Sequence, residues 1–208
     1  MTGAGLIELL DPGALATVQD LGRPGTLGWG VGVSGAMDPV ALAAGNILLG
    51  NEEGAAAIEI PVFPFRLRFA TAAGFAVTGA NVALSLDRRR LPPWWAARAP
   101  AGAVLEIGPP TAATWAASRA YLCVTGGIAV PAVLGSRATQ LRGAFGGHEG
   151  RPLRGGDRLP LGPQLAEAAH ADFGLVPPAL ALASDADGIP VIRALPAAEH
   201  DRFTDAAL

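Results

Sequence analysis

The sequence predicts a mainly β protein with one main helix, at about residues 39–49. Two observations indicate this fold class. Residues 57–69 and 82–86 alternate between apolar and polar side chains, which is the period-two pattern of strands with one face toward water. The 28 glycines and 18 prolines interrupt these short runs, and residues of these types mark tight turns between strands.

The main helix has a start and a stop signal. Asp38 can accept hydrogen bonds from the N–H groups of the first turn, and Pro39 suits the first helical position. Gly50 stands where a helix needs a left-handed residue at its end. The apolar positions between them follow at spacings of three, four and seven, which predicts one buried stripe. That stripe consists of Val40, Ala43, Ala44, Ile47 and Leu48.

Further strands are expected at 5–10, 120–124 and within the two similar stretches 101–109 and 155–163, each of which starts at a glycine turn. We expect residues 16–18 to pair beside 5–10. The T-G-A-N sequence between 75–77 and 82–86 predicts a hairpin.

The composition excludes several kinds of chemistry. The net charge is −3 and no long basic run occurs, so nucleic acid is not an expected partner. The chain contains no lysine, which excludes a Schiff base, a biotinylated lysine and a phosphate loop of the G-x-x-x-x-G-K-[ST] type. Cys123 is the single cysteine and is expected to be a buried, inert thiol.

The expected location is the cytoplasm. The N-terminus has no basic leader followed by a cleavage site, and no run of eighteen apolar residues predicts a membrane span. No metal site is expected, because His148, His170 and His200 stand far apart and show no ligand spacing.

Two glycine-rich stretches carry the candidate site residues, as substrate-binding or interface positions. We predict that the two stretches converge, since polar groups on glycine turns are costly to hold unless they serve each other or a ligand. The alternative is that each stretch satisfies its own polar groups locally. No catalytic base can be assigned. The candidates are Gln19, Asp20, Arg23, Ser34 and Asp38 in the first stretch and Ser136, Arg137, Thr139 and Arg151 in the second.

A series of motifs runs along the chain in order: T-V-Q-D-L-G-R-P-G, S-G-A-M-D, N-I-L-L-G-N, Y-L-C-V-T-G-G-I-A-V-P, L-G-S-R-A-T and G-G-H-E-G-R-P-L-R-G-G-D. With these motifs the sequence resembles the biotin-dependent carboxyltransferase / allophanate hydrolase subunit 2 family. That family includes the C subunit of the bacterial ATP-dependent 5-oxoprolinase and part of urea amidolyase.

The resemblance implies a cyclophilin-like β-barrel architecture for residues 1–163. Residues 164–190 are rich in alanine and proline and are expected to be a connector. Members of the family continue well past residue 208, so residues 191–208 resemble the start of a truncated second half.

The resemblance also implies a function, as the C-type component of a heteromeric 5-oxoprolinase that opens the lactam 5-oxoproline to glutamate. The chain would act with partner proteins of the B and A types, bind no cofactor alone, and depend on ATP through its partners. Two alternatives stay open: carboxyl transfer from carboxybiotin on a separate carrier to urea or a related amide, and a non-catalytic regulatory binding module. Either reaction needs an anion held by N–H groups and an arginine, which Arg23, Arg137 and Arg151 can supply.

Overall fold

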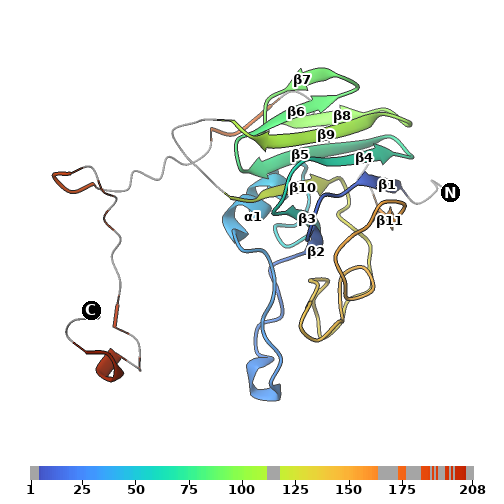
Figure 1. The fold of residues 1–208 in the computed structure, drawn as a ribbon. Helices are drawn as coiled ribbons and strands as arrows, with labels where there is room; N and C mark the ends of the chain where they lie inside the picture. The colour runs from blue at the N-terminus through green and yellow to red at the C-terminus, as the bar shows by residue number, and fades with distance from the viewer. Residues whose placement is uncertain are drawn as a thin grey trace. The chain divides into compact units, whose positions relative to one another are not determined.

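A computed structural model describes residues 5–111, 118–163 and 173–176, together with residues 184–187, 189, 191, 195, 196, 198 and 200–204 (Figure 1). Its strands form two antiparallel sheets. Sheet A has the spatial order β11 (Arg158–Pro160), β1 (Leu6–Asp11), β4 (Phe65–Phe69), β9 (Val104–Pro110), β6 (Val82–Leu86) and β7 (Arg89–Leu91). Sheet B has the order β2 (Thr17–Gln19), β3 (Ala57–Ile60), β10 (Ala120–Val124), β5 (Ala73–Gly79) and β8 (Ala96–Ala99). The described residues contain one α-helix, so the predicted mainly β fold with one main helix is confirmed.

The two sheets bury one hydrophobic core between them. In β4 the side chains of Leu67 and Phe69 are completely buried, whereas Arg66 and Arg68 lie on the opposite face. The ring of Phe69 lies 5.3 Å from the ring of Phe75 in β5, centroid to centroid, and so joins the two sheets. The period-two pattern in the sequence therefore identified the core face of this strand correctly.

The main helix, α1 (Pro39–Leu48), packs on the outer face of sheet B against β5 and β10 (Figure 1). Its start is fixed by Asp38, whose Oδ1 accepts a hydrogen bond from the N–H of Ala41 at 2.9 Å. Its end is followed by Gly50, which has a φ of 68° in the left-handed region. Both predicted end signals are confirmed.

The predicted buried stripe of α1 is only partly right, because Leu48 is buried as predicted and Ala44 packs against the buried cluster, but two other members are exposed. Val40 and Ile47 belong to that stripe, yet 64% and 54% of their surfaces are exposed. The helix is rotated so that Gly45 and Asn46 are buried in place of Val40 and Ile47. The buried face consists of Ala41, Leu42, Gly45, Asn46 and Leu48.

The reason is the close approach of α1 to sheet B at Gly45. A Cβ atom at this position would lie only 2.7 Å from Sγ of Cys123 and 3.0 Å from Oγ1 of Thr78. The Thr78 hydroxyl donates to the carbonyl of Ala41 at 2.6 Å, which fixes the helix on the sheet. Asn46 also points inward, because its amide donates to two carbonyls of the segment that follows the helix. Tertiary contacts of this kind override the apolar periodicity.

Two predicted strand pairings are also wrong. The T-G-A-N segment does not close a hairpin, because it carries the chain from β5 in sheet B to β6 in sheet A. The sharp reversal comes one strand later, between β6 and β7, where Asp87 and Arg88 have φ values of 48° and 68°. Likewise β2 pairs with β3 in sheet B, while β1 pairs with β4 and β11 in sheet A.

The chain divides into two compact units, Met1–Pro177 and Pro178–Leu208. The predicted connector at 164–190 and the predicted start of a second half at 191–208 lie largely outside the described residues. In the second unit, the described part includes the short 3₁₀ helix η2 (His200–Arg202) and a turn in which Asp185 accepts hydrogen bonds from the N–H groups of Asp187 and Ile189. No helix in the described part is long and apolar enough to cross a membrane.

Candidate functional site

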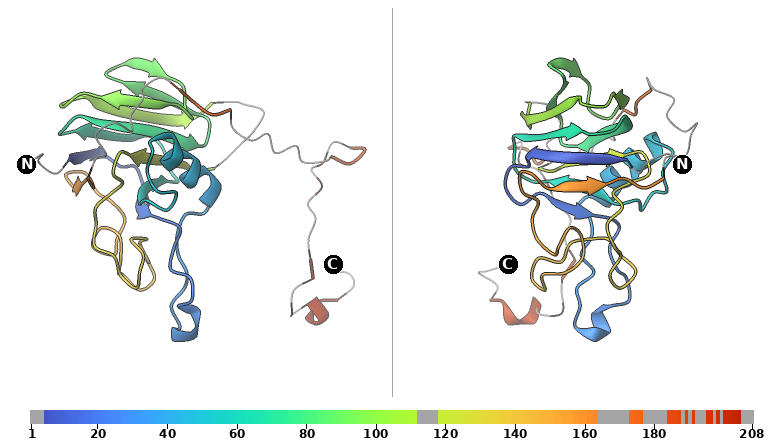
Figure 2. Two further views of the ribbon diagram at one scale, coloured as in Figure 1. Left: turned by 180° about the vertical axis from the view of Figure 1, so that it is seen from behind. Right: turned by 90° about the vertical axis from the view of Figure 1, so that its right-hand side faces the viewer.

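Residues 20–36 form an arm that leaves the edge of sheet B after β2 and projects away from both sheets (Figures 1 and 2). Its two sides are joined by backbone hydrogen bonds from Ala36 N–H to the Asp20 carbonyl and from Arg23 N–H to the Val33 carbonyl, each 2.8 Å. At the narrow base, a Cβ on Gly22 would lie 2.7 Å from the Ser34 carbonyl oxygen, so the ribbon closes here only with glycine.

The tip of the arm is the 3₁₀ helix η1 (Leu27–Trp29). Leu27 and Trp29 are 69% and 72% exposed. Asp20 and Arg23 are the only charged residues in the arm, and both are buried at its base. The arm therefore presents an uncharged tip with large apolar side chains, which is typical of a surface that contacts another protein.

At the base of the arm, Asp20 connects it to a second irregular segment, residues 133–151, which we call the loop. The Asp20 carboxylate accepts hydrogen bonds from the Ser136 hydroxyl at 2.7 Å and from the backbone N–H of Arg137 at 2.6 Å. It also accepts one from the N–H of Gly22 at 2.7 Å. Hydrogen bonds to an ionised acceptor are stronger than neutral ones, so this junction is rigid.

Arg23 is buried in the same junction, with 1% of its surface exposed. Its guanidinium donates to the carbonyls of Ala138 and Val133 and lies 5.1 Å from the ring centroid of Phe145. Nη1 has no hydrogen-bond partner within the described residues, and the buried Oε1 of Gln19 has none there either. Arg23 thus holds the loop against the arm through carbonyls and an aromatic ring rather than through a carboxylate.

Gln19 and Thr139 complete the junction. The Gln19 amide donates to the carbonyl of Thr139 at 3.3 Å, and the Thr139 hydroxyl donates to the carbonyl of Val18 at 2.9 Å. The structure thus brings six predicted candidates from two distant stretches together. They are Gln19, Asp20, Arg23, Ser136, Arg137 and Thr139.

Three predicted candidates lie elsewhere. Ser34 is exposed on the arm. Asp38 caps α1. Arg151 forms a bidentate pair with Asp157 at 2.8 and 2.9 Å and contacts Glu149. Its guanidinium is therefore paired with carboxylates close to it in the sequence. The hydrogen bond from Arg151 lowers the pKa of Asp157 to about 2.

The returning side of the arm is anchored on Glu59 of β3. Its Oε2 accepts hydrogen bonds from the backbone N–H of Met37 and from the Tyr121 hydroxyl, each 2.8 Å. The Tyr121 oxygen in turn accepts from the N–H of Asp38 at 2.8 Å. Burial raises the pKa of Tyr121, so its hydroxyl stays protonated and keeps donating. Both sides of the arm are therefore fixed to sheet B.

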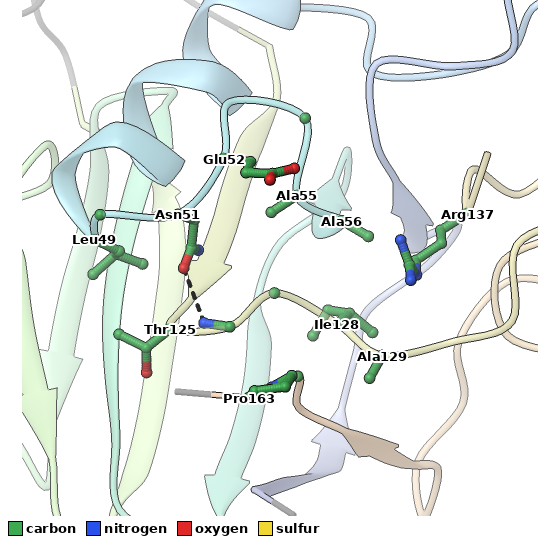
Figure 3. Close-up of a pocket in the computed structure, with 15 residues that line it drawn as sticks. Leu49, Asn51, Glu52, Ala55, Ala56, Thr125, Ile128, Ala129, Arg137 and Pro163 are labelled. Carbon is green, nitrogen blue, oxygen red and sulfur yellow. Dashed lines mark hydrogen bonds between the residues drawn. The ribbon is translucent and has the colours of Figure 1, made fainter. Parts of the chain in front are cut away.

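A pocket of about 340 Å³ lies between the C-terminal end of α1, the turn at 125–127 and the loop (Figure 3). Backbone and small side chains form most of its wall. Gly126 and Gly127 have φ values of 78° and 67°, and a Cβ on Gly127 would lie 3.1 Å from the Cβ of Ala55. Asn51 holds this turn in place, because its Oδ1 accepts from Gly126 N–H at 2.9 Å and its amide donates to the carbonyl of Val124 at 2.8 Å.

Two charged side chains line this pocket, Glu52 near Ala55 and Arg137 on the loop beyond Ala56 (Figure 3). The Arg137 backbone is held by Asp20, and its Nε donates to the carbonyl of Val130 at 2.9 Å. Within the part of the chain that the structure describes, its two terminal nitrogens and the Glu52 carboxylate have no partner, and the two side chains form no ion pair with each other. The pocket wall thus carries a cation and an anion that are not paired with each other.

The sequence patterns indicated Arg137 as a candidate site residue, but Asn51, Glu52 and the turn at 125–127 were not among the predicted site residues. The motifs N-I-L-L-G-N and T-G-G were the available signal, since each places polar or backbone groups directly after a helix or strand end. Among the described residues, no group of three or more His, Cys, Asp or Glu side chains could hold a metal ion.

A family model described as carboxyltransferase domain, subdomains A and B, matches residues 29–208. The chain belongs to this carboxyltransferase-domain family. The match confirms the resemblance drawn from the motifs, and it covers the arm tip from Trp29 onward, α1, the pocket and the loop.

This carboxyltransferase-domain chain is 39% identical over 200 residues to the C subunit of 5-oxoprolinase from Haemophilus influenzae, across 95% of this chain and 60% of that protein. It is 38% identical over 166 residues to the C subunit of 5-oxoprolinase from Escherichia coli, across 80% of this chain and 52% of that protein. The chain therefore spans little more than half the length of these relatives.

Solved structures show the same fold. The Kluyveromyces lactis urea carboxylase superposes with a TM-score of 0.69 at 37% identity, across 75% of this chain and 14% of that one. A structure of TTHA0988 superposes with a TM-score of 0.72 at 28% identity, across 86% of this chain and 63% of that one.

Proposed function

We propose that this chain is the C-type component of a heteromeric, ATP-dependent 5-oxoprolinase that opens 5-oxoproline to glutamate in the cytoplasm. The observation that carries the proposal is the 39% identity with the H. influenzae 5-oxoprolinase C subunit over 95% of this chain. The proposed partners are proteins of the B and A types from the same complex, and the proposed substrate is a small-molecule lactam.

Two features of the chain support a role that depends on partners. The arm carries an exposed, uncharged tip at Leu27 and Trp29. The 208 residues contain no lysine and so cannot form a lysine-containing phosphate loop, which agrees with ATP binding by a partner in the proposed complex.

Reconstitution tests this proposal. The chain is purified alone and together with its B-type and A-type partners, and ATP-dependent glutamate formation from 5-oxoproline is measured. We expect no glutamate from the chain alone, turnover with all components present, and loss of turnover when the chain is left out. Glutamate formation by the chain alone, or full turnover by the partners without it, would contradict the proposal.

A second candidate is carboxyl transfer from carboxybiotin, on a separate carrier, to urea or a related amide. The 37% identity with K. lactis urea carboxylase favours it. Carboxybiotin-dependent carboxylation of urea by the same preparation, without ATP-dependent glutamate formation, would support this candidate instead. Stable binding of the partners without either reaction would indicate a regulatory binding module.

A further inference from the structure

We propose that Arg137 and Glu52 recognise a small ligand that carries both a carboxylate and an amide N–H, as a cyclic lactam acid does. Arg137 binds the carboxylate, and Glu52 accepts a hydrogen bond from the N–H; both side chains line the same pocket (Figure 3). This inference rests on the proposed function, because it selects 5-oxoproline as the ligand to be tested.

The position of Arg137 favours an anion. Asp20 fixes its backbone and the Val130 carbonyl fixes its Nε, so the guanidinium is held at the pocket while both terminal nitrogens stay unpaired within the described residues. A guanidinium held in this way offers parallel N–H groups that match the two oxygens of a carboxylate.

The wall of the pocket at Glu52 is electronegative. The Glu52 carboxylate lies there without a partner among the described residues, next to Leu49 and Gly50 at the C-terminal end of α1. A helix C-terminus carries a partial negative charge, which adds to that of the carboxylate. A ligand group on this side should donate a hydrogen bond, and an anionic group would be repelled.

The remaining wall suits a small aliphatic ring. Ala55, Ala56, Ile128 and Pro163 contribute apolar surface to the pocket. The volume of about 340 Å³ lies near the lower end of the range for small-molecule sites, about 300–1,000 Å³. A five-membered lactam acid with a few waters fits this space.

Calorimetric or NMR titration of the full chain with three compounds tests the proposal. 5-Oxoproline carries both recognition groups, 2-pyrrolidinone lacks the carboxylate, and N-methyl-5-oxoproline lacks the N–H. We expect 5-oxoproline to bind most tightly. Loss of a hydrogen-bonded charged contact weakens binding by about tenfold to a hundredfold, so 2-pyrrolidinone should bind that much more weakly.

Variants assign each contact. Arg137→Ala should weaken 5-oxoproline binding by about tenfold or more and remove its advantage over 2-pyrrolidinone. Glu52→Ala should remove the advantage over N-methyl-5-oxoproline. The matched controls are Arg142→Ala, another exposed arginine of the loop, and Glu53→Ala, the neighbour of Glu52; neither residue lines the pocket, and neither variant should change binding. Thermal unfolding of each variant shows whether the fold is kept. Arg137→Lys serves as a second variant, which retains the positive charge but lacks the parallel N–H groups of the guanidinium.

Several outcomes overturn the proposal. It is wrong if 5-oxoproline does not bind the chain, if it binds no better than 2-pyrrolidinone, or if Arg137→Ala binds as well as the parent chain. The proposed function can fail separately: binding with the expected selectivity, combined with no glutamate formation by the reconstituted complex, would leave the site in place and reject the 5-oxoprolinase assignment. Full turnover by a complex that contains the Arg137→Ala variant would keep the 5-oxoprolinase assignment and reject the proposed binding site.

Discussion

Replacing Asp20 with asparagine tests whether the junction between arm and loop stabilises the fold. The carboxylate receives three hydrogen bonds, two at Oδ1 from Gly22 N–H and the Ser136 hydroxyl and one at Oδ2 from Arg137 N–H. Asparagine has one acceptor oxygen. If that oxygen occupies the place of Oδ1, the NH₂ group faces the N–H of Arg137, and two donors oppose each other.

The expected loss can be worked out from these contacts. An unpaired buried donor costs about 1–3 kcal/mol, and the two remaining bonds each lose about 1 kcal/mol when their acceptor is no longer charged. The Asp20→Asn variant should therefore be about 3–5 kcal/mol less stable, a large share of the roughly 5–15 kcal/mol that is typical of folded proteins.

Urea unfolding followed by tryptophan fluorescence measures this loss. Asp11→Asn is the matched control, because Asp11 is exposed and its carboxylate accepts only one hydrogen bond within the described residues, from Gly13 N–H at 3.2 Å. It should change stability by less than about 0.5 kcal/mol. If Asp20→Asn costs less than about 1 kcal/mol beyond this control, the reasoning about the junction is refuted.

Three further predictions concern packing, pH and thiol reactivity. Gly45→Ala should lower the free energy of unfolding by about 1–3 kcal/mol, because its Cβ would overlap Cys123, whereas Gly28→Ala, in open space, should change it little; urea unfolding of both variants checks this. The folded-state pKa of Asp157 is lowered from 3.8 to about 2 by the hydrogen bond from Arg151, so the pair contributes about 2 kcal/mol above pH 4 that is lost as the pH falls toward 2. Acid unfolding curves should show this loss in the parent protein and a smaller one in Arg151→Ala. Burial raises the pKa of Cys123 to about 12, so a thiol reagent at pH 8 should modify it only as fast as the protein unfolds; modification within seconds under native conditions would contradict this.

Local signals predicted the boundaries of α1 but not its orientation. Asp38 and Gly50 act within one turn of the helix, so their effect is visible in the sequence. The buried face depends on Gly45, which lets the helix approach a strand more than seventy positions away at Cys123. No periodicity within the helix contains that contact. The hairpin predicted at the T-G-A-N segment was wrong for the same reason. The segment connects strands of two different sheets, and the local sequence does not show which sheet receives the next strand.

In the candidate site, too, some features could be predicted from the sequence and others could not. Polar residues on glycine turns predicted that the two stretches lie together, and Asp20 and Ser136 do meet. That Asp20 binds the loop through Ser136 and the backbone could not be predicted, because it depends on which backbone N–H groups point at the Asp20 carboxylate. The local pairing of Arg151 had a visible signal, since Asp157 stands only six positions later. Whether any of these residues binds a substrate stays a prediction.

Sheet A has a consequence for how the polypeptide is made. Its second strand in space, β1, is flanked by β4 on one side and by β11 on the other, with Leu6 opposite Pro160. A nascent chain therefore keeps one edge of its first strand open until nearly the whole domain has left the ribosome, which takes roughly 8–30 s at about 5–20 residues/s. An open strand edge can pair with another polypeptide. During synthesis, this edge stays without its partner strand until β11 forms.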